Sequence, residues 1–392
     1  MIVAVINIET RAIGRTPDPS QGEVLAPVSE DDVRQALRGV SDPDLKQDIV
    51  SLGFVKKVQV TPERILVDVE RTVPSATVEA PLRARCEAAL GALGVAAIEI
   101  NVGFQVPPVT IPGKTPVPGV ARLIAVASGK GGVGKSTVAV NLALALSQSG
   151  ARVGLLDCDL YGPSVPALFG IQERAHADGQ KRLIPLSEYG IEVMSMGFLM
   201  DRLAALSWRG PMLHKMLSQF LFGTRWRELD YLLLDLPPGT GDVQLSLTQI
   251  APLAGAVLVT TPQKVALRDV VKGLEMFKSA GTPVLGVIEN MSYHLCPCCG
   301  ERTAVFGEGG AQRLADKYEM PLLGQIPFSR KVPSVLGSGE PLMVRDVSEE
   351  SAGDLTDRAA ADAFRAVARA TAAAISQARP GWAAAGPDAM EV

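Results

Sequence analysis

The sequence lacks a large excess of charge and any long apolar segment, and each absence excludes a class of protein. The formal net charge is -4 over 392 residues, which argues against a nucleic-acid-binding protein because a phosphate backbone selects strongly basic surfaces. No apolar run is as long as a membrane span, and no basic segment followed by an apolar one opens the chain. We therefore expect a cytoplasmic protein that binds neither nucleic acid nor a membrane.

Cysteine is scarce, and its distribution along the chain is uneven. There are five cysteines, at positions 86, 158, 296, 298 and 299. An odd number, with three thiols inside four residues, does not fit a secreted disulfide framework and is typical of a metal or redox site. Cys86 lies at a core-facing position of an expected helix, where apolar packing explains it.

The strongest motif is a glycine-rich loop between an apolar run and a helical pattern. Residues 123–127 predict a buried strand, and apolar residues recur at helical spacing after the loop. The loop fits G-x-x-x-x-G-K-[ST], in which backbone N–H groups and the helix N-terminus bind phosphates. Lys135 would reach the β- and γ-phosphates of ATP, and Ser136 would bind Mg²⁺. The residues predicted to bind the nucleotide here are Gly129, Lys130, Gly131, Gly132, Val133, Gly134, Lys135, Ser136 and Thr137.

Acidic or amide side chains follow three further apolar runs. Asp157 closes the run 152–156, Asp235 closes the run 231–234, and Asn290 comes just after the run 284–288. The second is the Walker B arrangement, in which the carboxylate holds Mg²⁺. Because strand-like runs alternate with helical patterns, the sequence predicts a mainly parallel sheet covered by helices on both faces, with the chemistry at the strand carboxyl ends.

Composition and pattern divide the chain into five parts. Residues 1–27 are a loose N-terminal extension, and residues 28–105 carry an α-β-β-α-β pattern that predicts a small α+β domain. Residues 106–120 contain five prolines and form a linker. Residues 121–378 make up a P-loop ATPase domain of the α/β class that ends in an alanine-rich helix, and residues 379–392 are a tail.

One residue in the loop narrows the class of P-loop protein. Lys130 makes the loop K-G-G-x-G-K-[ST], which resembles the deviant Walker A of the MinD/ParA family, where the extra lysine contacts the nucleotide of the facing subunit. The segment D-x-D-x-x-G-P-S is similar to switch I of that family. The resemblance implies that Asp159 orients or deprotonates the attacking water, while Asp157 supports Mg²⁺ and the loop. It further implies that Asn290 recognises adenine and that Pro327 lies against the base, although a turn or cap asparagine is the alternative.

The cysteine pair extends the resemblance. Cys296 and Cys299 form C-x-x-C, which is half a site, because zinc and iron-sulfur clusters usually take four ligands. K-G-G-V-G-K-S-T, D-C-D-L-Y-G-P-S-V-P, D-L-P-P-G-T-G-D, E-N-M-S and C-x-x-C-G together resemble the Mrp/ApbC iron-sulfur cluster carrier ATPases, from about residue 120 to 345.

That resemblance implies a homodimer that bridges a labile 4Fe-4S cluster through Cys296 and Cys299 of each subunit. It implies slow ATP hydrolysis linked to cluster exchange with apo-protein clients and cluster donors. The implied catalytic residues are Lys130, Lys135, Asp159 and Asp235. Cys298 departs from the family pattern, which leaves open which two thiols bind.

The small domain and the alternatives complete the interpretation. D-P-[ED] followed by D-I-V-x-L-G resembles the iron-sulfur assembly domain related to PaaD and SufT, but the cysteine that often follows its Thr-x-Pro-like turn is missing from residues 72–76. The main alternative is a MinD/ParA-type positioning ATPase with a structural zinc at the cysteine pair. An electron-transfer ATPase like the nitrogenase iron protein fits less well, because its cluster cysteines lie in two separate loops.

Overall fold

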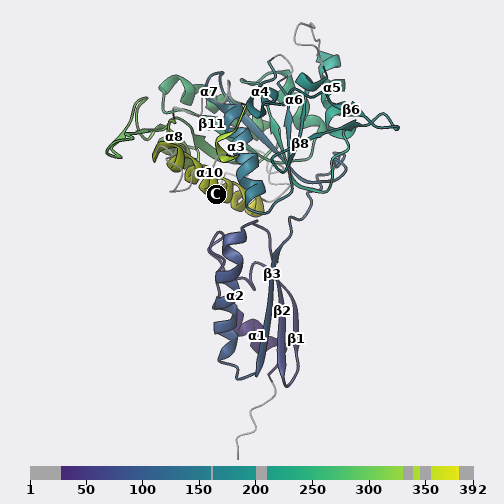
Figure 1. Cartoon of the computed structure of the whole chain (residues 1–392), viewed down its shortest axis with the longest axis vertical. Helices are drawn as coiled ribbons and strands as arrows, with labels where there is room; N and C mark the ends of the chain where they lie inside the picture. The colour runs from purple at the N-terminus through teal and green to yellow at the C-terminus, as the bar shows by residue number, and fades with distance from the viewer. Residues whose placement is uncertain (1–27, 160–161, 200–209, 330–338, 345–354, 379–392) are drawn as a thin grey trace, which may run out of the picture.

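The computed structural model describes residues 28–159, 162–199, 210–329, 339–344 and 355–378. In it the chain forms two structural units that lie end to end (Figure 1). The expected extension at 1–27 and tail at 379–392 lie outside the described residues. The division of the chain into domains at residues 106–120 stays a prediction.

The N-terminal unit has the α-β-β-α-β order that the sequence predicts. It consists of α1 (Glu30–Leu37), β1 (Val55–Val60), β2 (Arg64–Arg71), α2 (Ala76–Gly91) and β3 (Ala97–Phe104). Strand β2 lies in the middle, antiparallel to β1 and parallel to β3. Burial alternates along β2, so one face of the sheet packs under α2, and Cys86 is fully buried in that core.

The second unit is built on an eight-stranded sheet of order β15-β12-β11-β4-β10-β5-β9-β8 among the described residues. All neighbouring strands pair in parallel except the edge strand β8. This confirms the mainly parallel sheet. The strands are β4 (Val120–Ser128), β5 (Val153–Asp157), β8 (Leu186–Glu188), β9 (Ile191–Ser195), β10 (Leu229–Asp235), β11 (Leu253–Thr260), β12 (Val284–Glu289) and β15 (Leu322–Gln325).

Helices cover both faces of this sheet, since every residue of the central strand β11 is buried. α3 and α10 pack against each other and against one face, while α7 and α8 pack together against the other. The helices are α3 (Lys135–Gln148), α4 (Val165–Phe169), α5 (Gly210–Phe222), α6 (Asp242–Ile250), α7 (Lys264–Ser279), α8 (Gly310–Lys317) and α10 (Leu355–Gln377), with 3-10 turns η1 (Met196–Phe198) and η2 (Leu342–Val344). Two small hairpins pair β6 (His176–Ala177) with β7 (Leu183–Ile184) and β13 (His294–Leu295) with β14 (Arg302–Thr303).

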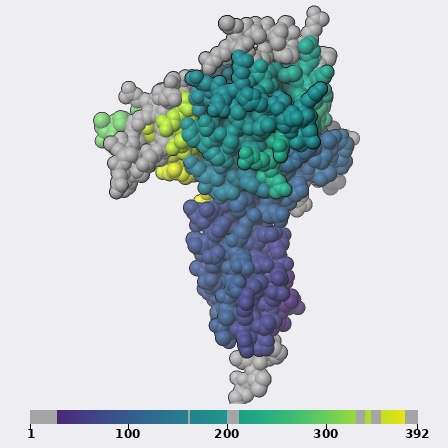
Figure 2. Space-filling model, turned by 45° about the vertical axis from the view of Figure 1, so that its right-hand side comes forward, coloured from purple at the N-terminus to yellow at the C-terminus, as the bar shows by residue number. Residues whose placement is uncertain are grey.

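Helix α10 also joins the two units, at the place where Figure 1 shows them meeting. Arg369 donates to Oδ1 of Asp44 at 2.7 and 3.0 Å, and Ser376 forms a hydrogen bond with Thr72. Figure 2 shows the N-terminal unit as a narrow lobe below the broader lobe of the large sheet. No helix within the described ranges is long and apolar enough to cross a membrane.

Candidate functional site

The glycine-rich loop connects the end of β4 to the start of α3. A Cβ atom at Gly129 would lie 2.1 Å from the backbone carbon of Asp269, so only glycine fits there. At Gly134 the backbone has φ +79°, and a Cβ atom would lie 2.3 Å from Nδ2 of Asn290. The loop therefore keeps these glycines for backbone approach and for a left-handed conformation, as a phosphate-binding loop requires.

Two side chains of the loop, Lys135 and Ser136, lie close to Asp235 in the interior of the site. Nζ of Lys135 lies 2.5 Å from Oδ1 of Asp235 and 3.0 Å from Oγ of Ser136. Asp235 is fully buried at the end of β10, and its Oδ2 has no hydrogen-bond partner. A buried carboxylate oxygen without a partner, close to a lysine and a serine hydroxyl, is a group that fits a cation ligand.

A second buried carboxylate, Asp157, pairs with Asp235 in register across β5 and β10. Burial and the neighbouring Asp235 carboxylate raise the pKa of Asp157 to about 7. Burial also raises the pKa of Asp235, while Lys135 opposes that shift. The site therefore concentrates negative charge that a cation would relieve.

Asp157 organises the loop that follows β5. Its Oδ1 accepts a hydrogen bond from the backbone N–H of Asp159 at 3.0 Å. Its Oδ2 accepts from the N–H of Val165 at 3.2 Å and from the hydroxyl of Ser195 at 3.1 Å. Both oxygens are thus occupied in shaping this loop, which leaves the half-buried Asp159 facing the pocket.

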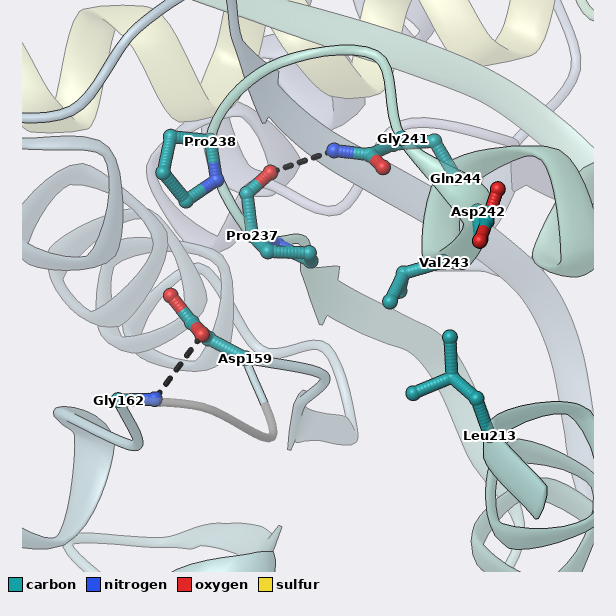
Figure 3. Close-up of a pocket in the computed structure, with 9 residues that line it drawn as sticks. All are labelled: Asp159, Gly162, Leu213, Pro237, Pro238, Gly241, Asp242, Val243 and Gln244. Atoms are coloured by element: carbon teal, nitrogen blue, oxygen red, sulfur yellow. Dashed lines mark hydrogen bonds between the residues drawn. The ribbon is translucent and has the colours of Figure 1, made fainter. Parts of the chain in front are cut away.

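A pocket of about 510 Å³ opens beside these residues (Figure 3). It lies between the loop after β5, the glycine-proline turn after β10 and the helices α5 and α6. Nε2 of the buried Gln244 donates to the carbonyl oxygens of Pro237 at 2.6 Å and Gly239 at 3.0 Å. Gln244 therefore fixes the turn in this conformation. The lining residues are Asp159, Gly162, Leu213, Pro237, Pro238, Gly241, Asp242, Val243 and Gln244.

The remaining nucleotide residues of the sequence analysis lie around the same loop. Nδ2 of Asn290 donates to the carbonyl oxygen of Val133 at 2.9 Å, so this side chain holds the loop itself. The segment that contains the buried Pro327 runs beside it, because the N–H of Ser292 donates to the carbonyl of Ile326 at 2.9 Å. Lys130 is half-buried at the tip of the loop.

The cysteines lie on the hairpin β13–β14, which directly follows β12 in the chain. Cys298 and Cys299 are exposed, and Cys296 is half-buried. The backbone N–H groups of Cys298 and Cys299 point at the Cys296 sulfur and hold the pKa of that thiol below its usual value. A thiolate stabilised by backbone donors is suited to metal binding. Within the described ranges, no group of three or more His, Cys, Asp or Glu side chains is arranged to hold a metal ion.

Sequence reasoning missed three residues that position the site. Ser195, Gln244 and Glu289 carry no motif of their own. Gln244 reaches the turn just before its own helix, whereas Ser195 and Glu289 reach segments more than 20 residues away. Glu289 precedes Asn290 at the end of β12, and that place in the chain was the one available signal. Long-range contacts of this kind depend on the strand order, which a single sequence does not give.

Comparison with known proteins bears on both units. Residues 119–363 match the family model described as NUBPL iron-transfer P-loop NTPase, and residues 30–102 match the model described as iron-sulfur cluster assembly protein. An iron-sulfur cluster carrier protein of Deinococcus radiodurans is 44% identical over 348 residues, which are 88% of this chain and 95% of that protein.

Two further relatives agree. The iron-sulfur cluster carrier protein of Escherichia coli is 41% identical over 338 residues, covering 85% of this chain and 92% of its own length. A nucleotide-binding protein of Archaeoglobus fulgidus, solved in complex with ADP, is 43% identical with a TM-score of 0.50; the match covers 56% of this chain and 87% of that one. These similarities do not favour the alternative of a positioning ATPase.

Proposed function

Because this chain belongs to the family of NUBPL iron-transfer P-loop NTPases, we propose that it is an ATP-hydrolysing carrier of a labile 4Fe-4S cluster. It works in the cytoplasm as a homodimer, takes the cluster from a donor and passes it to apo-proteins. One observation supports the proposal: the cysteine hairpin follows β12 after a few residues, and Asn290 at the end of that strand holds the glycine-rich loop. Cargo and nucleotide sites are therefore neighbours along one short segment.

ATP hydrolysis needs positive charge that binds the phosphates and a water molecule positioned for attack. Lys135 binds the β- and γ-phosphates, and on binding it exchanges its contact with Asp235 for the phosphate oxygens. Asp159, which borders the pocket, positions the attacking water. Lys130 reaches the nucleotide of the facing subunit, and Asn290 with Pro327 lies on the side of the base. The turn after β10 responds to the γ-phosphate by leaving its contact with Gln244.

A magnesium ion fits the donors that the site offers. Asp235 has a buried oxygen without a partner, and the Ser136 hydroxyl lies within hydrogen-bond reach of the same lysine. Carboxylate and hydroxyl oxygens are the ligands that Mg²⁺ prefers, usually with water and phosphate completing its shell. Ser136 and Asp235 would hold the ion, and its charge would neutralise the phosphates.

The cluster needs more ligands than one hairpin supplies. Two cysteines per chain, Cys296 and Cys299, become four when two copies face each other, and four thiolates are the usual set for a 4Fe-4S cluster. The third thiol, Cys298, lies between them and is exposed like Cys299, so the assignment of Cys296 and Cys299 rests on the C-x-x-C spacing.

Anaerobic reconstitution with iron and sulfide tests this proposal. We expect about four iron and four sulfide per dimer, with visible absorption that disappears in Cys296→Ala and Cys299→Ala and persists in the matched variant Cys298→Ala. An absent iron-sulfur chromophore, with zinc retained at one ion per dimer, would refute the cargo. Equal losses in all three variants would refute the ligand pair.

A further inference from the structure

Glu289 occupies the base of the cysteine hairpin and is fully buried. Its Oε1 accepts hydrogen bonds from the hydroxyl of Ser292 at 2.6 Å and from Nε2 of Gln325 at 2.8 Å. Its Oε2 accepts from the backbone N–H of Ala311 at 2.8 Å. Ser292 lies at the start of the segment between β12 and α8 that carries the cysteines. Ala311 lies just after the end of this segment, in the first turn of α8. One carboxylate therefore holds both ends of this segment by hydrogen bonds.

Gln325 carries the same restraint outward to the hairpin itself. Its Oε1 accepts a hydrogen bond from Arg302 of β14 at 3.3 Å. The guanidinium of Arg302 lies 3.8 Å above the centre of the Tyr293 ring, at the start of the hairpin. A stacked cation at this distance adds to the hydrogen bond in fixing the hairpin's orientation. The chain of contacts thus runs from Glu289 to β14 and to Tyr293, the residue just before β13.

Asn290, the residue just after β12, makes the corresponding contact on the nucleotide side. Asn290 donates to the Val133 carbonyl of the glycine-rich loop, and its own backbone N–H is held by the Thr260 carbonyl of β11 at 2.8 Å. Gly134 lies so close to this amide that a Cβ atom there would displace it. Adjacent residues at the end of one buried strand therefore hold the nucleotide loop and the cysteine hairpin.

We propose that Glu289 is a positioning residue that fixes the cysteine hairpin to the end of β12, so that movement of the nucleotide loop is passed to the cysteine pair. This role rests on the proposed function, in which the two sites work together. The carboxylate accepts from all three neighbours at once, whereas an amide at this position keeps a single acceptor oxygen, so Ser292 or Gln325 would have to reverse its role as donor.

The side-chain chemistry gives a rescue experiment. Glu289→Gln removes one acceptor, and Gln325→Glu places two carboxylates against each other, so each single substitution loosens the hairpin. In the double variant the amide at position 289 donates to the carboxylate at position 325 and still accepts from Ala311. Glu192→Gln is the matched control, because Glu192 is a buried carboxylate of β9 that accepts from Arg227 and contacts neither site.

Hydrogen exchange of the full-length chain without cluster is the readout. The hairpin amides to follow are those of Cys296 and Gly300, which donate to the carbonyls of Glu301 and Cys296. We expect each single variant to exchange at least about tenfold faster at these amides, which corresponds to about 1.4 kcal/mol. Glu192→Gln should match the wild type, and the double variant should return to within about threefold of it. Unchanged exchange in Glu289→Gln, or no recovery in the double variant, would overturn the proposal.

Adding ADP tests the transmission. In the wild type we expect ADP to slow exchange of the hairpin amides, and in Glu289→Gln we expect ADP to bind with similar affinity while the hairpin no longer responds. If ADP does not change hydrogen exchange at the hairpin amides of the wild type, movement is not passed from the nucleotide loop to the cysteine pair. If Glu289→Gln does not fold, comparing Gln325→Glu with the double variant decides the same question. None of these measurements requires a cluster, so a failed reconstitution would disprove the cargo and leave this result interpretable.

Discussion

The contact between the N-terminal unit and α10 allows a quantitative test of how the two units are held together. Nε and Nη2 of Arg369 donate to one oxygen of Asp44, whose other oxygen accepts from Nη2 of the buried Arg71 at 2.6 Å. Asp44 is 6% exposed and Arg369 is 43% exposed. Arg71 is thus a fixed, desolvated partner, whereas Arg369 is half in solvent.

These exposures set the expected sizes. Arg369→Ala should lower the free energy of unfolding by about 1 kcal/mol, since a half-exposed ion pair is at the upper end of surface pairs. Asp44→Ala should cost about 3 kcal/mol, because it removes a partner from a buried arginine that keeps Asp42 and the Val73 carbonyl. The double variant should show a coupling energy of about 1 kcal/mol between the two positions.

Urea unfolding of the full chain measures this cycle. Arg365 is the matched control: it lies one turn earlier on α10, is 49% exposed and pairs with Asp362 of the same helix at 2.8 Å. A cycle between Asp44 and Arg365 should give no coupling. If the Asp44–Arg369 coupling is no larger than this control, the ion pair does not hold the units together and the reasoning from its geometry is wrong.

Other predictions concern the nucleotide site. Lys135→Ala should abolish ATP hydrolysis in a phosphate-release assay, and normal turnover would refute its role. Gly129→Ala should lose binding of a fluorescent ATP analogue because its Cβ meets backbone at 2.1 Å, whereas Gly131→Ala, whose Cβ would meet no protein atom closer than 3.9 Å, should lose less of it. Equal affinities in the two variants would contradict the steric argument. The stability of the nucleotide-free chain should fall by at most about 4 kcal/mol as the pH rises from 4 to 8.

The sign of that pH effect follows from Asp157. Its pKa in the folded chain is raised to about 7, so between pH 4 and pH 7 the folded state keeps a proton that the unfolded state has released. The stabilisation is complete at low pH and is lost as the pH rises through 7. Urea unfolding of Asp157→Asn should show a flatter pH profile, and an unchanged slope would assign the effect to another group.

The sequence predicted the parts of the fold that repeat a local pattern. The alternation of apolar runs and helical segments predicted the parallel sheet, and the alanine-rich pattern predicted the helix that ends the second unit, α10. Edges and small elements were missed: β8 is an antiparallel edge strand, and β13 and β14 have two residues each. Strands this short carry no period-2 signal, so only the tertiary structure defines them.

The site divides in the same way. The motifs that contain Lys135, Ser136 and Asp235 have a spacing that reflects one local geometry. The structure brings Ser136 and Asp235 within hydrogen-bond reach of Lys135. Glu289 and Gln244 act across strands and turns, so no spacing of residues in the sequence predicts their contacts. Asn290 has a contact that its motif does not predict, because its amide holds the loop through Val133, and its place beside adenine stays a prediction.

Helix α10 sets the distance between the N-terminal unit and the cysteine hairpin within one chain. Near its start, the hydroxyl of Thr356 donates to the Leu295 carbonyl at the cysteine hairpin, and near its end Ser376 contacts Thr72 of the N-terminal unit. Twenty residues of helix at about 1.5 Å per residue separate these contacts by about 30 Å. Thr72, the first residue of the turn at 72–76, therefore contacts the far end of α10 and lies distant from the cysteine hairpin. In this arrangement the turn cannot touch the hairpin of its own chain, so a direct contact between the two requires undocking from α10 or a second chain.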